Sequence, residues 1–431
     1  MELMNQKGFA SILVIGIIIA IIAVGTGSYF YVSKQSEESL TENPAINEST
    51  DPAPALESEN ISEPIVIQEQ ESKKETTLPS AEAQPETKKP ASVPAPTQIP
   101  TITKEPVIVP QNTCSRAFSP RYSAGPYYTG PLFDAHLHMP TLIDISKADP
   151  SKLEGHGADI AGHIGVDRDA ELDKLLCNFE REKVRGAIGF TIGEAELLTE
   201  TLSGAKSMKA KVGSMVDLFL TPASFNAGGL DNIIAGNPNL FAGFGEMAFY
   251  HPSYANTPPD ASSVVQIYEV AGKHNIIVMM HPDARQEIAI ENAIKQNPNV
   301  KFLLHGPETE NTVHGIIGKY PNVYYSIDAM LIRLSSAPGA LMYMVSGKDE
   351  FKTKFAQNYT AILNNSVNQW KAKIEQYPGR YMWGTDRSDP WTYDEDMSAL
   401  IEEFARDFIA ELDPAVQENF AYKNAEGLLR R

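Results

Sequence analysis

Two histidines separated by one residue, His136 and His138, are the first residues of this chain whose types and spacing could do chemistry. They close the segment 132–138, which reads LFDAHLH. Its apolar start predicts a β-strand, and the two-residue period of a strand places both imidazoles on one face. Imidazole binds zinc, iron and nickel, so a pair at a strand end suits a divalent metal without selecting one. A His-x-His pair alone is more often coincidental or structural than functional.

Four further apolar runs also end in a side chain that can bind a metal. These side chains are Glu246, His281, His305 and Asp386. Each of them alone would more often cap a loop or have a structural role. Barrel enzymes, however, place their active sites where the strands end, so the joint pattern gains weight. The sequence therefore predicts one metal centre built from these four residues together with His136 and His138.

The elements that must position these residues begin at about residue 111, where short apolar runs alternate with longer amphipathic stretches. That alternation is typical of parallel β/α architecture. The expected strands cover residues 131–138, 185–191, 211–220, 240–248, 276–281, 300–305, 323–327 and 380–386. The expected helices include residues 169–183, 262–273, 284–296 and 398–412. Eight strands are the number of a (β/α)8 TIM barrel, which takes about 250 residues. We expect residues 113–431 to form such a catalytic domain.

The strand-end pattern resembles the amidohydrolase superfamily over residues 130–430, including the ending Asn424-Ala425-Glu426. In that superfamily the paired histidines of strand one and the aspartate of strand eight bind one ion. The histidines of strands five and six bind or face a second ion. By position, these ligands are His136, His138 and Asp386 for the first ion, and His281 and His305 for the second. The resemblance implies a metal-dependent hydrolase on a TIM barrel.

The fourth strand departs from the commonest form of the superfamily. Many members bridge the two ions with a carbamylated lysine there, but no lysine occurs between Asn232 and Lys273. Glu246 stands at that place, as in the TatD-like branch and some phosphotriesterase-type relatives. In mononuclear members, such as decarboxylases similar to the aminocarboxymuconate semialdehyde enzyme, His281 would join the first site and His305 would act in catalysis. The resemblance therefore implies one or two ions, with zinc expected and manganese, iron or nickel as alternatives.

The expected reaction follows from the ion. A bound divalent metal lowers the pKa of its water from 15.7 toward about 7, which supplies hydroxide at neutral pH. Asp386 would take the proton of the water and pass it to the leaving group, or act only as a ligand. The leading hypothesis is hydrolysis of an amide, ester, lactone or phosphoester bond in a small molecule. The alternatives are a metal-dependent decarboxylase of the same superfamily and a non-catalytic, surface-anchored binding domain.

Residues near the strand ends are weaker candidates, because substrate groups are read by loops that vary freely on a fixed scaffold. Tyr250, Asp328 and Arg387 could reach a substrate, although each is more often a loop or ion-pair residue. The remaining histidines considered are read as surface or structural residues. They are His156, His163, His274 and His314.

The amino-terminal part of the chain predicts a membrane anchor, over residues 1–35. Residues 9–32 carry no charge and, as a helix, exceed a hydrocarbon core of about 30 Å. Lys7 before this span and the acidic pair Glu37 and Glu38 after it favour an exported catalytic domain. The junction at residues 6–11 resembles the leader of type IV prepilins, but Leu13 stands where that family usually has glutamate.

Composition bounds the rest of the chain. Residues 36–112 are rich in proline and acidic residues and poor in aromatic residues, which predicts a disordered linker. The net charge of -19 would repel polyphosphate backbones, so a small-molecule substrate is expected and nucleic acid is not. Cys114 and Cys177 could pair as a disulfide outside the cytoplasm or stay apart. Nothing in the sequence indicates an oligomeric state.

Overall fold

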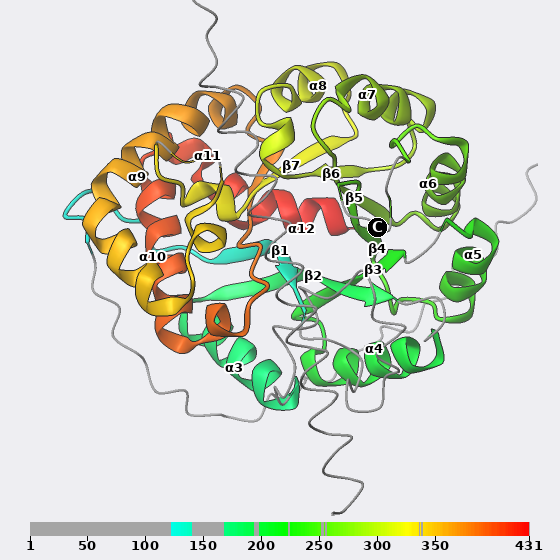
Figure 1. Cartoon of the computed structure of the whole chain (residues 1–431), viewed down its shortest axis with the longest axis horizontal. Helices are drawn as coiled ribbons and strands as arrows, with labels where there is room; N and C mark the ends of the chain where they lie inside the picture. Colours follow the sequence, from blue (N-terminus) through cyan, green and yellow to red (C-terminus); the bar gives the residue numbers. More distant parts are fainter. Residues whose placement is uncertain are drawn as a thin grey trace, which may run out of the picture. The chain divides into compact units, whose positions relative to one another are not determined.

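A computed structural model describes the residues from 122 to 430, apart from 140–167, 194–197, 223–224, 251–253, 255–256, 336 and 338. The described residues form one sheet of eight parallel strands, in the order β1-β2-β3-β4-β5-β6-β7-β8. Helices surround this ring of strands (Figure 1). Backbone hydrogen bonds from Asp386 N to His136 O (2.7 Å) and from His138 N to Arg387 O (2.9 Å) join the chain after β8 to β1. The arrangement fits the predicted (β/α)8 barrel.

All eight expected strands are present. Their bounds are β1 Leu132–His138, β2 Val184–Gly193, β3 Val216–Pro222, β4 Gly243–Ala248, β5 Ile277–His281, β6 Phe302–Leu304, β7 Val323–Ile327 and β8 Tyr381–Trp383. The prediction for the third strand began too early, at Lys211. That residue belongs to the last turn of the preceding helix, where Lys209 and Lys211 suit the negative end of the helix dipole.

A helix follows each strand and covers the outside of the barrel. These helices are α3 Arg168–Arg181, α4 Leu198–Val212, α5 Ala227–Gly236, α6 Ser262–His274, α7 Glu287–Gln296, α8 Val313–Lys319, α9 Lys348–Gln376 and α10 Glu395–Ala410. In α3, Leu172, Leu175 and Phe179 are fully buried, at the spacing that brings one helical face against the sheet. The 29-residue helix α9 is the longest of these helices and fills the connection between β7 and β8.

Side chains of the strands divide between two apolar clusters. The cluster outside the strands includes Leu218, Val278 and Leu304, which pack with the helices. The smaller cluster fills the barrel interior. It contains Phe133, Ala135, Ile188, Phe190, Phe219, Ile277, Met279, Leu303, Met382, Ala425 and Leu428. The interior of the barrel is therefore a packed core, and the open positions for chemistry lie at the ends of the strands.

The last helix belongs to the barrel interior rather than to its outer layer. After α11 (Pro414–Glu418) and the π-helical turn η8 (Asn419–Lys423), the chain ends in α12 (Asn424–Leu429). In Figure 1, α12 runs across the ring of strands. Its Ala425 and Leu428 pack with the inward-facing side chains of the strands. The Asn424-Ala425-Glu426 ending thus closes the barrel from one end.

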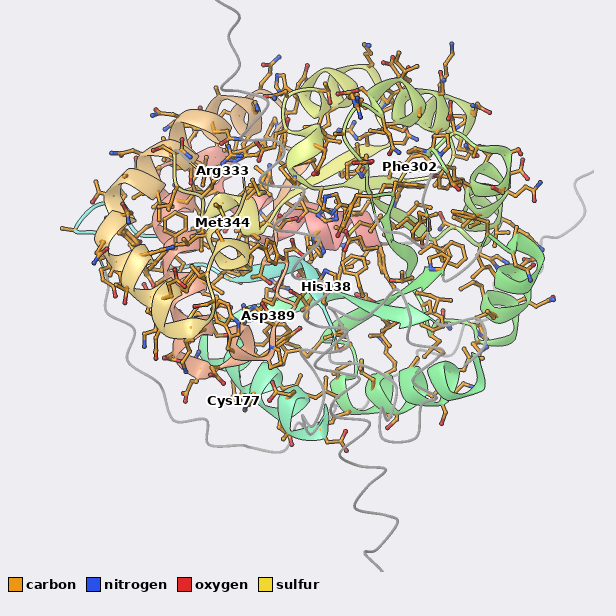
Figure 2. All side chains as sticks on the ribbon, viewed as in Figure 1. His138, Cys177, Phe302, Arg333, Met344 and Asp389 are labelled. Atoms are coloured by element: carbon orange, nitrogen blue, oxygen red, sulfur yellow. The ribbon has the colours of Figure 1, made fainter. Side chains whose placement is uncertain are left out.

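Several predictions from the sequence lie outside the described residues, namely the anchor over 1–35, the linker over 36–112, Cys114, His156 and His163. None of the helices that the structure describes is long and apolar enough to cross a membrane. Cys177 lies on α3 in the outer helix layer, far from His138 (Figure 2), and it is disulfide-bonded.

Candidate metal centre

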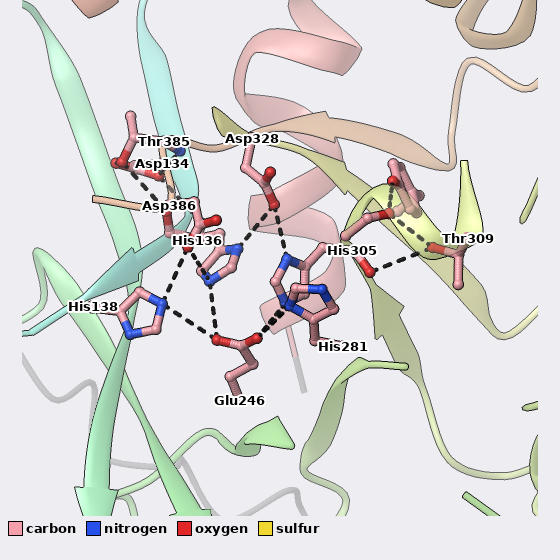
Figure 3. Close-up of polar contacts among 12 residues, drawn as sticks. Asp134, His136, His138, Glu246, His281, His305, Thr309, Asp328, Thr385 and Asp386 are labelled. Carbon is pink, nitrogen blue, oxygen red and sulfur yellow. Dashed lines mark hydrogen bonds and ion pairs between the residues drawn. The ribbon is translucent and has the colours of Figure 1, made fainter. Parts of the chain in front are cut away.

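The six side chains predicted to bind metal come together at the carboxyl ends of the strands. His136 and His138 stand on β1, Glu246 on β4 and His281 at the end of β5. His305 directly follows β6, and Asp386 comes three residues after β8. Figure 3 shows them around one centre, with the Glu246 carboxylate between His138 on one side and His281 and His305 on the other.

A break in regular strand pairing turns the histidines of β1 inward. Phe133 and Ala135 already point into the barrel, so strict alternation would send residues 136 and 138 outward. The register between β1 and β2 shifts between Asp134 and Leu137, which marks a bulge. One extra residue in a bulge reverses the alternation beyond it, and bulges are frequent next to active sites. His136 and His138 therefore face the interior.

A second bulge does the same for Glu246. Phe244 and Met247 both pack in the outer apolar cluster, although an odd number of steps separates them. The register between β4 and β5 shifts between these two residues. Beyond the bulge, Ala248 pairs with His281, and Glu246 shares the inward face of that pair. Strand periodicity counted from Phe244 would have placed Glu246 on the wrong face.

Glu246 lies between two pairs of histidines. Its Oε1 is 2.8 Å from His281 Nδ1 and 2.8 Å from His305 Nε2. Its Oε2 is 3.3 Å from His138 Nε2 and 3.7 Å from His136 Nε2. The ligand atoms form three groups that could hold an ion. Two of them share the Glu246 carboxylate, His136-His138-Glu246 and Glu246-His281-His305, and the third consists of His136, His305, Asp328 and Asp386. Such an arrangement is what a carboxylate shared by two ions would need.

Asp386 faces the histidines of β1. Its Oδ1 lies 3.1 Å from His138 Nε2 and 3.2 Å from His136 Nε2. The backbone of Asp386 has a φ of 54°, in the left-handed region that is uncommon for residues other than glycine. Two hydrogen bonds hold it there, from Asp386 N to His136 O (2.7 Å) and from the Tyr343 hydroxyl to Asp386 O (2.6 Å).

The donor set fits a divalent ion. His136 is fully buried, and within the described part of the chain its Nε2 has no hydrogen-bond partner. This nitrogen points between the carboxylates of Asp386 and Glu246. A buried polar atom without a partner is costly, and a ligated ion would satisfy it. Imidazole nitrogens with carboxylate oxygens are the ligands of zinc, iron and manganese sites.

Asp328, one of the weak substrate candidates, has a different place. Its side chain is only 2% exposed, and its Oδ2 lies 3.0 Å from His136 Nδ1 and 3.1 Å from His305 Nδ1. It therefore stands behind two histidines, on the side away from Glu246. This geometry leaves the Asp328 carboxylate little open surface, and its role as a substrate contact stays a prediction. A carboxylate in this position can orient both rings.

Arg387 also points away from the centre. Its guanidinium is fully buried outside the barrel, where it bonds to Ser398 and Glu402 of α10 and donates to the Thr385 hydroxyl (3.2 Å). Asp134 lies 4.0 Å from it. These partners correspond to the ion-pair alternative that the sequence left open. Arg387 thus holds the segment after β8, which pairs with β1, against α10.

Tyr250 keeps its place as a candidate substrate contact. The residue is 52% exposed, and its ring centroid lies 4.4 Å from that of His281. Two other histidines have partners away from the centre, as the sequence suggested. His274 Nε2 is 2.6 Å from Asp231, and His314 Nδ1 is 3.1 Å from the Tyr381 hydroxyl.

Sequence reasoning missed two residues of the centre, Glu308 and Tyr343. Glu308 Oε2 lies 2.9 Å from His281 Nε2. Its position three residues after His305 was the available signal, since that places it in the loop at the same barrel end. Tyr343, which bonds to the backbone of Asp386, comes from the long connection between β7 and α9, and no motif distinguishes it.

The charges of the centre raise the pKa of His138, His281 and His305 before an ion binds. Burial would lower the pKa of His305, but the charge of Glu246 and the hydrogen bond to Asp328 outweigh it and raise the pKa to about 10. Burial would also lower the pKa of His138, but hydrogen bonds to Asp386 and Glu246 outweigh it and raise this pKa well above its usual value. The pKa of Glu246 is held well below its usual range by the surrounding histidines, against the effect of burial.

Solved structures with a similar course of the chain are distant in sequence. An amidohydrolase from Burkholderia multivorans is 13% identical, with a TM-score of 0.48, covering 70% of this chain and 99% of its own. A dihydroxybenzoic acid decarboxylase from a Polaromonas species, solved with manganese, is 12% identical, with a TM-score of 0.43, covering 69% and 96%. An amidohydrolase from Bifidobacterium longum subsp. infantis is 12% identical, with a TM-score of 0.42, covering 69% and 98%.

No curated protein matches the chain. The family model described as Amidohydrolase matches residues 133–431, from the second residue of β1 to the end of the chain. That match includes the barrel apart from the first residue of β1, and all six side chains of the centre. Over more than half of its length, therefore, this chain belongs to the amidohydrolase family.

Proposed function

We propose that the chain is a metal-dependent hydrolase that cleaves an amide, ester, lactone or phosphoester bond of a small molecule. The position of Glu246 between two histidine pairs is the observation that carries the proposal. A carboxylate shared in this way suits two ions, and paired ions are typical of hydrolytic sites. Membership of the TatD-like branch, which also has glutamate at this place, stays a hypothesis.

In this proposal His136, His138 and Asp386 hold the first ion, and His281 and His305 the second, with Glu246 between them. The nitrogen and oxygen donors suit zinc, and manganese, iron and nickel remain alternatives. When bound, such ions lower the pKa of water toward about 7 and polarise a carbonyl or phosphoryl oxygen.

Asp386 is the residue that we assign to proton transfer. Its side chain is 12% exposed and that of Glu246 is 7% exposed, so the Asp386 carboxylate is the more accessible of the two. A carboxylate within hydrogen-bond reach of the reacting groups can take a proton and return it to the leaving group. His305 is 1% exposed and enclosed by Glu246 and Asp328, which supports a ligand role over the catalytic role expected for a mononuclear site.

Metal content tests the proposal. The full-length chain, purified after expression with added zinc or manganese, should contain up to two ions per chain by elemental analysis. His136→Ala should lose at least one of them. His274→Ala is the matched control, because that histidine pairs with Asp231 away from the centre. Absence of bound metal in the parent, or equal content in the two variants, would contradict the proposal.

A substrate panel then separates the reactions. Amides, lactones, phosphodiesters and aromatic carboxylates would be offered to the metal-loaded chain, and products would be followed by mass spectrometry. Incorporation of oxygen from labelled water into a product is expected for a hydrolase. Release of carbon dioxide without water addition would instead identify a decarboxylase, and no turnover with bound metal would favour a binding domain.

Membrane attachment is a separate proposal from the sequence. We propose that residues 1–35 anchor the chain in a membrane, with residues 36–112 as linker and the catalytic domain outside the cytoplasm. The test is protease treatment of intact cells after fractionation. The barrel should be found with membranes and be cleaved from outside, and recovery in the soluble fraction would contradict the anchor.

A further inference from the structure

The turn after β6 brings a carboxylate to the far side of the His281 ring. The turn reads His305-Gly306-Pro307-Glu308, and its last two residues belong to the 3-10 helix η4 (Pro307–Thr309). Gly306 has a φ of 97°, where a side chain would be strained. A Cβ at this position would also lie 2.4 Å from His281 Nε2. Glycine therefore leaves the space in which His281 and Glu308 meet.

Hydrogen bonds on both sides fix this turn. On the barrel side, the Tyr325 hydroxyl donates to Gly306 O (2.9 Å), and so does the Thr309 hydroxyl (3.2 Å). Farther along, Glu310 accepts from Arg333 (2.9 Å) and from Gln369 of α9 (2.7 Å). A turn held in this way presents the Glu308 carboxylate from a defined position.

The ring of His281 lies between two carboxylates. Its Nδ1 is 2.8 Å from Glu246 Oε1, on the side of the centre, and its Nε2 is 2.9 Å from Glu308 Oε2. A neutral imidazole carries one N–H, and a carboxylate that accepts it determines which nitrogen stays unprotonated. With the N–H on Nε2 toward Glu308, the lone pair of Nδ1 faces Glu246 and the centre.

The same relation holds for His136 and His305, whose Nδ1 atoms lie 3.0 and 3.1 Å from Asp328. Outer carboxylates of this kind orient metal-binding histidines and raise their basicity. Glu308 differs from Asp328 in exposure, since its side chain is 27% exposed and that of Asp328 is 2% exposed. Glu308 thus contacts His281 from the more exposed side of the centre. Asp328 contacts His136 and His305 from the buried side.

We propose that Glu308 is a positioning residue, which holds His281 in the tautomer and orientation that make Nδ1 a ligand of the second ion. The proposal rests on the proposed metal-dependent function. It assigns to Glu308 no contact with the ion, and its effect passes through the ring of His281. Loss of the carboxylate leaves His281 free to rotate and to carry its proton on Nδ1, so the second ion is the one that is lost.

The test compares Glu308→Ala with Glu308→Gln in the full-length chain. Zinc affinity would be measured by competition with a chromophoric chelator, and cobalt-loaded samples would report ligand geometry by their visible spectra. Glu308→Ala should weaken binding of the second ion, at His281 and His305, by about 10- to 100-fold and alter the cobalt spectrum. Glu308→Gln keeps an oxygen that accepts from Nε2, so its affinity should return to within a few fold of the parent and its spectrum should match.

Glu287→Ala is the matched control, since it removes a glutamate of the first turn of α7 that is not among the possible metal-binding groups of the described residues. If the parent binds no ion, the proposed function fails, and the inference fails with it. If the parent binds two ions and Glu308→Ala binds them equally well, only the inference fails. Equal weakening in the Ala and Gln variants, together with a lower melting temperature, would show a purely structural role and would also overturn it.

Discussion

At the scale of single residues, the histidines of the centre differ in which carboxylate contacts the ring nitrogen that faces away from the centre. Asp328 supports His136 and His305 from the buried side, and Glu308 supports His281 from the open side. His138 is the most exposed of these rings, at 23%, and its Nε2 faces Asp386 and Glu246. The ring orientations therefore depend on residues that a list of metal ligands does not include.

Replacing Asp328 tests this dependence. Asp328→Ala removes one carboxylate oxygen shared by two buried rings, so we expect zinc affinity to fall by about 10- to 100-fold. The buried Nδ1 of His136 would also lose its hydrogen-bond partner, which costs about 1–3 kcal/mol. Chelator competition and thermal unfolding measure the two effects. Asp283→Ala, at an exposed loop residue after β5, should change neither, and unchanged zinc affinity in Asp328→Ala would contradict the role.

Arg387 supplies a second prediction at this scale. Arg387→Met leaves Glu402 buried without its partner, and breaking one side of a buried ion pair costs about 3–5 kcal/mol. We expect this loss in the free energy of unfolding, measured in denaturant. The double variant Arg387→Met/Glu402→Leu removes both charges and should recover most of it. A single variant as stable as the parent would contradict the structural role given to this pair.

At the scale of elements, the two bulges and the last helix decide where the chemistry can occur. The bulges in β1 and β4 turn ligand side chains into the barrel, and α12 fills the opposite end. Because the interior is packed, the centre is open only at the carboxyl ends of the strands. The 29-residue helix α9 then carries Gln369, which helps to hold the turn that bears Glu308.

The packing of α12 can be tested by truncating one side chain. Leu428 is 2% exposed and lies in the interior cluster, so Leu428→Ala should cost about 2–5 kcal/mol of unfolding free energy. Ile288 on α7 is 78% exposed, and Ile288→Ala should change stability by less than about 0.5 kcal/mol. Denaturant titrations of both variants give the comparison. Equal stabilities would show that α12 does not close the barrel core.

At the scale of the whole molecule, the chain is acidic, and acidic side chains also surround the candidate metal centre. The net charge is -19, and Glu246, Glu308, Asp328 and Asp386 gather around the histidines. These carboxylates raise the pKa of His138 and His281 and bring that of His305 to about 10. Before an ion binds, the centre therefore holds protons at neutral pH.

Metal binding should in consequence depend on pH. An ion needs unprotonated nitrogen, so binding displaces these protons, and the apparent affinity rises with pH up to the raised pKa values. For each proton released, we expect about a tenfold gain per pH unit. Zinc competition at several pH values between about 6 and 8 measures the slope, and His274→Ala should give the same slope as the parent. An affinity that does not change with pH would contradict the raised pKa values.

The sequence by itself determined the eight strands, their order and the six strand-end side chains. Apolar runs separated by amphipathic stretches suffice for this, because parallel strands in a barrel all end at the same edge. His281, His305 and Asp386 were placed correctly in this way. The start of β3 was not, since the predicted strand included Lys211, which lies in the last turn of α4.

Only the tertiary structure decided which way the side chains point. Regular alternation would have turned the histidines of β1 and Glu246 outward, and the bulges that correct this depend on pairing with the neighbouring strands. Asp328 meets His136 across 192 residues of sequence, and Arg387 finds Glu402 on the outside of the barrel. Such contacts arise from the closure of the barrel, and local periodicity carries no information about them.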